Sequence, residues 1–312
     1  NKHSALKGEK TLAKVIAVTT NKGGVLKTSL VTNIAGVLSK SEQERQIILQ
    51  ALEEYKQTGK RMSSKLAMKL SKSKTKGEGK RVLIVDTDSQ ANVSISFGID
   101  NPEDTYEVTL LEVILEGIEP KKAIVNVHKN IDLLPSNMHL SKLTFIVLSN
   151  LEEYAKEKGV FYLLKDKIDS LRDEYDYILI DTPPDLGLIS GNALVASDEI
   201  LIPFQPESYS MRSLVTIMET IGDFKEHQGI DLNILGIVPT LVDSRTNLHS
   251  EILTECRRFG EYLDVKVFDT VIPKSIRFAT SVKRMKKPAT LTNYVDDPLV
   301  QSYYELVKEM RL

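Results

Sequence analysis

The chain contains one cysteine, Cys256, among its 312 residues. A single cysteine excludes a disulfide framework, a paired-cysteine metal site and a cluster held by several thiolates from this chain alone. Because Cys256 lies inside a helical pattern, we expect it to be a small buried apolar residue. No run of 18 apolar residues occurs, so the sequence predicts no membrane span. The first 14 residues are polar and lack the apolar stretch of a signal peptide, which predicts a cytoplasmic protein.

An excess of charge of one sign is also missing. Lys and Arg number 41, Asp and Glu number 43, and the formal net charge is −2 at pH 7. The molecule is therefore not a polycation, and any surface for nucleic acid has to be a local patch. Hydrophobic residues make up 41%, which is ordinary for a soluble globular protein with a substantial core. We expect a single domain over residues 1–312, with an insert at about 41–80.

Short apolar runs between polar or turn residues predict buried strands. They lie at 15–18, 82–85, 178–180, 200–203 and 234–238, with a weaker sixth at 267–271. Helical periodicity is found at 28–38, 154–171, 210–227, 248–262 and 298–310. Strands that alternate with helices predict an α/β fold with a doubly wound, mostly parallel sheet flanked by helices. In such sheets ligands bind at the carboxyl ends of the strands.

A glycine-bearing loop follows the first predicted strand. Residues 21–29 read Asn-Lys-Gly-Gly-Val-Leu-Lys-Thr-Ser and lead into a predicted helix. Backbone N–H groups of such a loop and of the helix N-terminus point at a phosphate. Lys27 would reach the outer phosphates of a nucleotide, and the Thr28 hydroxyl would ligate Mg²⁺. Lys22 is an additional lysine before the glycines. Leu26 stands where the ordinary motif has glycine, so a plain strand-to-helix turn stays an alternative for this loop alone.

Two more predicted strands end in carboxylates. Asp86 and Asp88 follow the second strand, and side chains at i and i+2 of a strand point the same way. Near a phosphate loop they suit water positioning or Mg²⁺ coordination; the alternative is a pair of turn or helix-capping aspartates. Another apolar strand ends at Asp181, as in phosphate-loop NTPases, where this aspartate holds Mg²⁺ through water. The three strand ends together predict one phosphate–metal site.

These blocks resemble a known family. They read Lys-Gly-Gly-Val-x-Lys-Thr at 22–28, Val-Asp-x-Asp-x-Gln-x-Asn at 85–92 and Ile-Asp-x-Pro-Pro-x-Leu-Gly at 180–187, with further blocks at 192–194, 203–210, 236–240, 243–247 and 270–277. The combination is similar to the ParA/Soj partition ATPases, which belong to the deviant Walker A group of P-loop NTPases together with MinD. The resemblance covers about residues 13–312 apart from the insert.

The resemblance implies a catalytic role for three residues. Lys27 would bind the β- and γ-phosphates. Lys22 matches the signature lysine that reaches across a dimer interface to the nucleotide of the other subunit, where it supplies the charge of an arginine finger. Asp88 would orient the attacking water. Metal binding is implied for Thr28, Asp86 and Asp181.

The resemblance also implies a binding site for ATP or ADP. Gly23 and Gly24 would let two subunits approach across the phosphates, and Ile272 and Pro273 would pack near the adenine. The implied nucleotide-binding residues are Lys22, Gly23, Gly24, Val25, Leu26, Lys27, Thr28, Ser29, Ile272 and Pro273. Leu26 departs from the glycine of the family. It is tolerated at negative φ but strained by about 1–3 kcal/mol at positive φ. A pseudo-ATPase that binds nucleotide poorly stays an alternative.

The family resemblance further implies that an ATP-bound homodimer binds double-stranded DNA without sequence preference, on the nucleoid, and that a ParB-like protein stimulates hydrolysis through a short N-terminal segment. The candidate DNA-binding residues are Arg245, Lys274, Arg277, Lys283, Arg284, Lys286 and Lys287. An ordinary solvated loop is the alternative for 283–287. Base-specific readout and repression of its own operon are not expected, because no N-terminal helix-turn-helix domain is present.

The insert interrupts the alternation of strands and helices, since 41–80 is far longer than a normal connection. Residues 42–57 predict a helix extension or a separate helix, and 71–79 has the composition of a mobile linker. From residue 56 to 81 there are ten Lys or Arg and one acid, Glu78. The insert is either a solvated segment without a partner or a basic arm for nucleic-acid phosphates.

Three other activities occur within the same group of ATPases, and each has its own sequence requirement. A MinD-like membrane-cycling ATPase needs a C-terminal amphipathic basic helix, whereas 298–312 has mixed charges and predicts a packed final helix. An iron–sulfur carrier or reductase needs cluster cysteines that this chain lacks. A bacterial tyrosine kinase needs a tyrosine-rich tail and a membrane partner, and neither is visible.

Overall fold

A computed structural model describes residues 11–73, 78–155, 159–243 and 245–312, and in this part of the chain eight strands form one sheet. The strands are β1 (Lys14–Val18), β2 (Val82–Asp86), β3 (Val125–His128), β4 (Ile131–Leu134), β5 (Tyr177–Asp181), β6 (Glu199–Phe204), β7 (Asn233–Val242) and β8 (Ile272–Pro273). Their order is β3-β4-β2-β5-β1-β6-β7-β8, and only the β3–β4 pair is antiparallel. The predicted mostly parallel, doubly wound sheet is confirmed.

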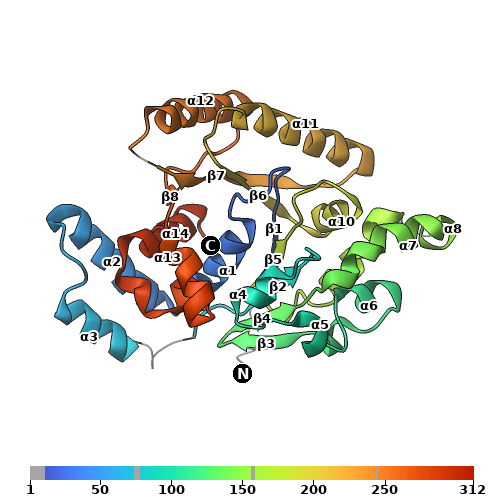
Figure 1. Ribbon diagram of the computed structural model, residues 1–312, viewed down its shortest axis with the longest axis horizontal. Coiled ribbons are helices and arrows are strands. Elements are labelled where there is room, and N and C mark those ends of the chain that lie inside the picture. The colour runs from blue at the N-terminus through green and yellow to red at the C-terminus, as the bar shows by residue number, and fades with distance from the viewer. Residues whose placement is uncertain (1–10, 74–77, 156–158, 244) are drawn as a thin grey trace, which may run out of the picture.

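Helices cover both faces of this sheet (Figure 1). They are α1 (Lys27–Leu38), α2 (Glu42–Thr58), α3 (Ser64–Ser73), α4 (Asn92–Ser96), α5 (Pro102–Thr105), α6 (Leu110–Leu115), α7 (Leu143–Ser149), α8 (Leu151–Tyr154), α9 (Lys165–Asp169), α10 (Leu188–Ala196), α11 (Ser210–Gln228), α12 (Asn247–Leu263), α13 (Ile276–Thr280) and α14 (Pro298–Met310). Ile16 and Val18 of β1 pack with α1, α2 and α14, whereas Val15 and Ala17 pack with α6, α7, α9 and α10. Strands buried on both faces explain why they read as continuous apolar runs.

The register brings the predicted site together. β5 lies between β1 and β2, and it runs parallel to both. Asp181 pairs with Val18 on one side and with Asp86 on the other. The phosphate loop therefore leaves β1 at the same sheet edge where β2 and β5 present their aspartates.

Two predicted elements were wrong. The helix expected at 154–171 is broken into α8, a 3-10 turn (Val160–Tyr162) and α9, because Gly159 has φ 93°, which no α-helix accepts. The strand expected at 267–271 is reduced to one bridge between Val267 and Ile237, and the edge strand is β8 instead. Strands β3 and β4 were not predicted.

The insert is a packed helical hairpin. Helix α2 is separate from α1, because Ser41 starts it with a capping box to Glu44 and Gly59 ends it in the left-handed conformation. Helices α2 and α3 bury Ile48 and Leu66 in the core that they share with α14. The expectation of a mobile linker at 71–79 is wrong for 71–73, which are the end of α3; residues 74–77 lie outside the described residues.

Candidate nucleotide-binding site

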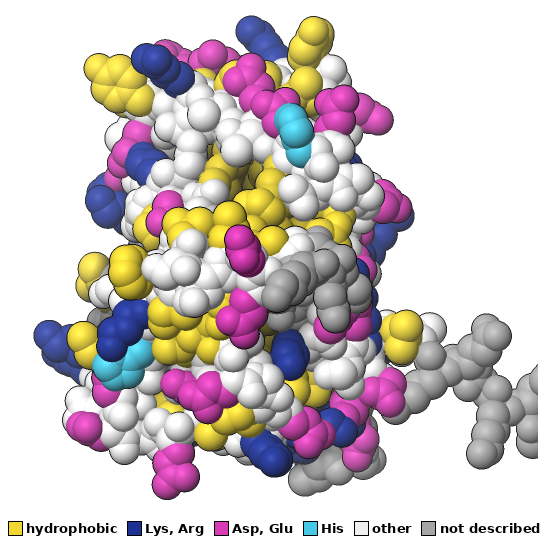
Figure 2. All heavy atoms as spheres, turned by 90° about the vertical axis from the view of Figure 1, so that its right-hand side faces the viewer, with side chains coloured by type: hydrophobic (Ala, Val, Ile, Leu, Met, Phe, Trp, Pro, Cys, Tyr) yellow, Lys and Arg dark blue, Asp and Glu magenta, His cyan; other side chains and the backbone are white. Residues whose placement is uncertain are grey.

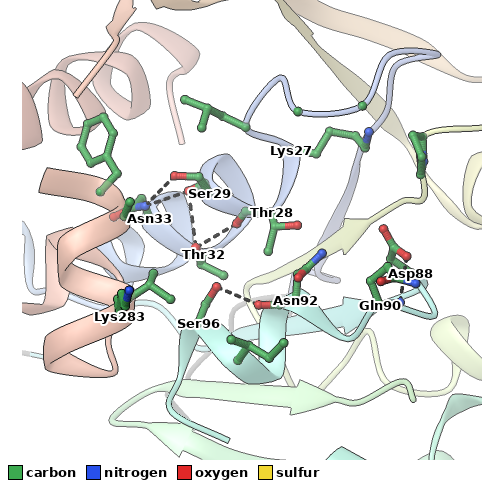
Figure 3. A pocket seen from close by; sticks show the side chains of 18 of the residues that line it. Lys27, Thr28, Ser29, Thr32, Asn33, Asp88, Gln90, Asn92, Ser96 and Lys283 are labelled. Atoms are coloured by element: carbon green, nitrogen blue, oxygen red, sulfur yellow. Dashed lines mark hydrogen bonds between the residues drawn. The ribbon is translucent and has the colours of Figure 1, made fainter. Parts of the chain in front are cut away.

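A cavity of about 880 Å³ lies at the carboxyl ends of β1, β2 and β5 (Figure 3). The phosphate loop, the first turns of α1, the β2–α4 connection and the segment from α13 into a π-helical turn (Ser281–Met285) all contribute to its wall. The residues that line it are Gly23, Gly24, Leu26, Lys27, Thr28, Ser29, Thr32, Asn33, Asp88, Gln90, Asn92, Ile95, Ser96, Asp100, Pro184, Phe278, Ala279, Val282, Lys283 and Lys286. Its volume suits a small-molecule ligand.

The loop backbone turns twice through the left-handed region before α1 begins. Gly24 has φ 73°, and Leu26 has φ 70° and ψ 25°. The Leu26 conformation is the one that favours glycine, and it costs a residue with a Cβ about 1–2 kcal/mol. Within α1, all of which is described, the first turn has no acidic residue, and no side chain caps the helix. The positive end of the helix is thus open to an anion.

Lys27 places a buried amine beside this turn. Its side chain is largely buried, and its Nζ donates to the Lys22 carbonyl oxygen at 3.2 Å. Burial lowers the pKa of Lys27, while the carboxylates of Asp181, Asp88 and Asp185 oppose the shift. The amine is therefore poorly solvated, so its attraction to an added phosphate is screened less than it would be in water.

Thr28 and Asp181 form a candidate Mg²⁺ site. The Thr28 hydroxyl donates to Asp181 Oδ2 at 2.6 Å, whereas Asp181 Oδ1 is buried without a hydrogen-bond partner among the described residues. Burial raises the pKa of Asp181 to about 7. An orphaned carboxylate oxygen next to a hydroxyl is a hard-oxygen donor set of the kind that Mg²⁺ uses. The residues present therefore fit the metal.

The two aspartates at the end of β2 have different environments. Asp86 is fully buried, and its two carboxylate oxygens accept the backbone N–H groups of Asp88 and Val93 at 3.0 and 3.3 Å. Burial, with a contribution from nearby Asp181, raises the pKa of Asp86 well above its usual range. Asp88 lines the cavity and accepts the Gln90 N–H at 3.0 Å. Asp86 thus holds the turn that presents Asp88 to the cavity.

Lys22 lies outside the residues that line this cavity. Its Nζ is 2.5 Å from Glu207 Oε2, in the connection between β6 and α11. Glu207 also accepts from Gln205 Nε2 at 2.6 Å. The two lysines of the loop therefore point to different places, with Lys27 at the cavity and Lys22 paired on the partly exposed surface.

Comparison with known proteins decides the family. The sequence matches the family described as AAA domain over residues 56–234. It is also 30% identical to ParA family protein MG470 of Mycoplasma genitalium over 305 residues, which cover 95% of this chain and 96% of the relative. The chain belongs to the ParA family of P-loop ATPases.

Two further likenesses agree with this assignment. The chromosome partitioning protein ParA of Myxococcus xanthus is 27% identical to this ParA family member over 97% of the chain and 90% of the relative. The crystal structure of cobyrinic acid a,c-diamide synthase from Mycobacterium smegmatis, with bound ADP and magnesium, matches with a TM-score of 0.67 and 26% identity. That match covers 95% of this chain and 93% of the synthase. The resemblance to ParA and the expected fold are confirmed.

Several cavity residues of this ParA family member were missed. Gln90 and Asn92 belong to the sequence block that contains Asp88 but were given no role. Asn33 lies one turn after Ser29 on α1 and donates to the Ser29 carbonyl oxygen at 2.8 Å. A helical wheel could have found it. Phe278 also lines the cavity, and no sequence signal pointed to it.

Other predicted binding residues lie away from the cavity wall. Val25 is buried, and its carbonyl oxygen accepts from Thr240 Oγ1 at 3.2 Å. Ile272 is fully buried in the core, and Pro273 pairs with Val242 of β7. Neither lines the cavity, so their proposed contact with adenine stays a prediction.

The candidate DNA-binding residues do not share one environment. Arg245 is 86% exposed at its side chain and forms a two-point contact with Asp243, at 2.9 and 2.7 Å. Lys283 and Lys286 line the cavity, and Lys286 donates to both carboxylate oxygens of Asp100 at 2.7 and 2.8 Å. Lys274, Arg284 and Lys287 are exposed, and the side chain of Arg277 lies outside the described structure. DNA contact by this set stays a prediction.

The structure bears on the membrane-cycling alternative through helix α14 and on the iron–sulfur alternative through Cys256 in helix α12. Helix α14 buries Val300, Tyr303 and Leu306 in the core, as predicted for a packed final helix. Over the described ranges, the chain has no helix long and apolar enough to cross a membrane. Cys256 is fully buried in α12, and burial raises the pKa of its thiol to about 12, as expected for a small core residue.

Proposed function

We propose that this protein is a DNA-partition ATPase in which nucleotide controls assembly. Mg²⁺ and ATP bind in the cavity, two ATP-bound copies associate, and the dimer binds double-stranded DNA without sequence preference. Hydrolysis, stimulated by a ParB-like partner, reverses both steps. Membership in the ParA family and the chromosome partitioning relative support this proposal.

The proposal rests on the different positions of the two loop lysines. Phosphoryl transfer needs positive charge on the transferred group, and Lys27 is the buried amine at the cavity. Lys22 keeps its amine outside its own cavity, on Glu207. An amine that is unused by its own site but close to the loop is available to the nucleotide of a second copy. A monomer would then lack one of two charges, and dimerisation would supply it.

The remaining site residues have separable roles. Thr28 and Asp181 would hold Mg²⁺, which neutralises charge on the phosphates when bound. Asp88 is a carboxylate at the cavity that can orient a water for attack, whereas Asp100, which also lines it, is paired with Lys286. Asp86 acts through Asp88, because its carboxylate accepts the Asp88 backbone N–H.

The conformation of Leu26 favours an active site over a pseudo-ATPase. Its backbone already has the left-handed turn that a glycine would adopt, and its side chain packs against the core cluster of α1 and α14. Leucine therefore lowers the folding stability of the protein, while the loop still borders an open cavity of about 880 Å³. This geometry supports nucleotide binding.

Sedimentation and DNA binding under defined nucleotide conditions test the proposal. With Mg²⁺ and ATP we expect a dimer that binds a random-sequence duplex, and with ADP a monomer that does not. Lys27→Ala should abolish nucleotide binding. Lys22→Ala should keep nucleotide binding in the monomer but lose dimerisation and turnover. DNA binding that depends neither on nucleotide nor on Lys27 would refute the switch.

A matched control distinguishes the specific effects of the two loop-lysine substitutions from the effect of losing one positive charge elsewhere. Lys225 lies on α11, and Lys225→Ala should behave as the unmodified protein in all three assays. If Lys22→Ala hydrolyses ATP at the unmodified rate, the lysine does not act across the interface and the dimer mechanism is wrong.

A further inference from the structure

Four basic residues of the insert form two groups with different surroundings. Lys56 pairs with Glu305 of α14, and Arg61 lies 3.7 Å from Asp297 at the start of the same helix. These two residues attach the α2–α3 hairpin to α14. Lys65 and Lys69 are exposed and form no ion pair with any residue in the described ranges.

Helix α3 holds these lysines in fixed positions. Leu66 and Leu70 are spaced i, i+4 and are buried against the rest of the insert and the core. Lys65 and Lys69 have the same spacing on the outward side, so their Cα atoms are about 6 Å apart along the helix. Met68 lies between them and is 61% exposed. The lysines thus form an ordered row on a packed element rather than part of a loose arm.

The row lies in a stretch without acidic residues. Between residues 55 and 77 the sequence has eight Lys or Arg and no Asp or Glu, in a chain whose net charge is −2. The side of the molecule seen in Figure 2, at the right of Figure 1 and away from α3, instead mixes acidic, basic and hydrophobic side chains. Positive charge is therefore concentrated in this stretch of the sequence, as binding of a polyanion requires.

DNA fits this row better than a membrane does. A helix that lies on a bilayer has to insert an apolar face. The apolar face of α3 is already occupied, because Leu66 and Leu70 pack inside the protein. What remains outward is Lys65 and Lys69, with Met68 as the one large exposed apolar side chain of α3. One methionine is too little for a face that inserts into a bilayer, whereas paired lysines suit phosphate-backbone binding.

We propose that the outward row of α3, Lys65 and Lys69, is a second contact surface for the phosphate backbone of DNA. The inference rests on the proposed DNA binding and adds a surface remote in sequence from Arg245 and from the 283–287 run. Each lysine–phosphate contact releases counterions and contributes about 0.9 to the slope of log affinity against log salt. The row belongs to the insert and not to the cavity wall, so its loss should leave nucleotide binding intact.

Salt-dependent DNA binding tests this surface. Affinity for a labelled random-sequence duplex is measured by fluorescence anisotropy over a range of KCl, with Mg²⁺ and a non-hydrolysable ATP analogue. For Lys65→Ala/Lys69→Ala we expect the magnitude of the slope of log affinity against log salt to decrease by about two, and affinity to weaken at each salt concentration. Lys65→Arg/Lys69→Arg should restore both. Nucleotide affinity and the melting temperature should equal those of the unmodified protein.

The control is Lys122→Ala/Lys142→Ala, which removes the same charge from exposed positions near α6 and α7. It should leave the slope unchanged. Equal slopes for both double variants overturn the inference but not the proposed function. An unmodified protein that binds no DNA in any nucleotide state overturns both. Loss of binding to phosphatidylglycerol vesicles, with DNA binding unchanged, assigns the row to a membrane and also overturns the inference.

Discussion

Leu26 offers a direct test of the loop geometry. Its φ of 70° should cost about 1–2 kcal/mol relative to glycine. Glycine in turn loses about 0.5–1 kcal/mol through the greater freedom of the unfolded chain. Leu26→Gly and Leu26→Ala remove the same packing against the core, apart from one methyl group, but only the glycine variant relieves the backbone. We therefore expect Leu26→Gly to be more stable than Leu26→Ala by about 0.5–1 kcal/mol.

Urea unfolding of the nucleotide-free protein measures this difference, read from midpoints at equal m-values. Ala35→Gly is the control, because Ala35 lies inside α1 at ordinary helical φ. There glycine should destabilise the protein by about 1–2 kcal/mol, which is the opposite sign, because it weakens the helix and removes a fully buried methyl group. If Leu26→Gly is no more stable than Leu26→Ala, the backbone at this position is not left-handed in solution and the argument for the loop fails.

Four other experiments have clear expected outcomes. A Cβ on Gly36 of α1 would lie 2.2 Å from Thr290 Oγ1, so Gly36→Ala should lower stability by about 1–3 kcal/mol. Gly222→Ala, in open space on α11, should raise it by about 1 kcal/mol, and thermal melts that rank the two the other way contradict the packing. Cys256 should react with a thiol reagent only in urea, and rapid labelling of the folded protein at pH 8 would show that it is not buried. Asp181→Asn should remove the Mg²⁺ dependence of nucleotide affinity measured by calorimetry; an unchanged dependence would exclude it from the metal site.

Sequence patterns predicted the centre of the fold well, for a physical reason. Strands buried on both faces need continuous apolar runs, and β1, β2 and β5 were found from theirs. The edge strand β3 is partly exposed, with the sequence Val-Asn-Val-His, so burial does not impose such a run. The sequence of residues 42–57 predicted a helix extension or a separate helix but not the partner of its apolar face, which is the core that it shares with α14.

The candidate site divides in the same way. Its phosphate side was predictable, because Lys27, Thr28 and Asp181 follow directly from strand ends that the sheet aligns. The opposite wall was not, because Phe278 comes from a segment far along the chain whose position depends on the completed fold. The direction of Lys22 also depends on a distant partner, Glu207, and no local pattern encodes it.

The central place of β1 has a consequence for synthesis of the protein. β1 is made early, yet Lys14 pairs with Tyr177 and Ile16 with Glu199, so both neighbouring strands leave the ribosome much later. The hydrogen bond between the hydroxyls of Ser29 and Tyr303, at 3.0 Å, also cannot form until Tyr303 has been synthesised. Such long-range pairing slows folding and leaves apolar segments exposed meanwhile. The phosphate loop therefore acquires the neighbours that pack around it only after β5, β6 and α14 have been synthesised.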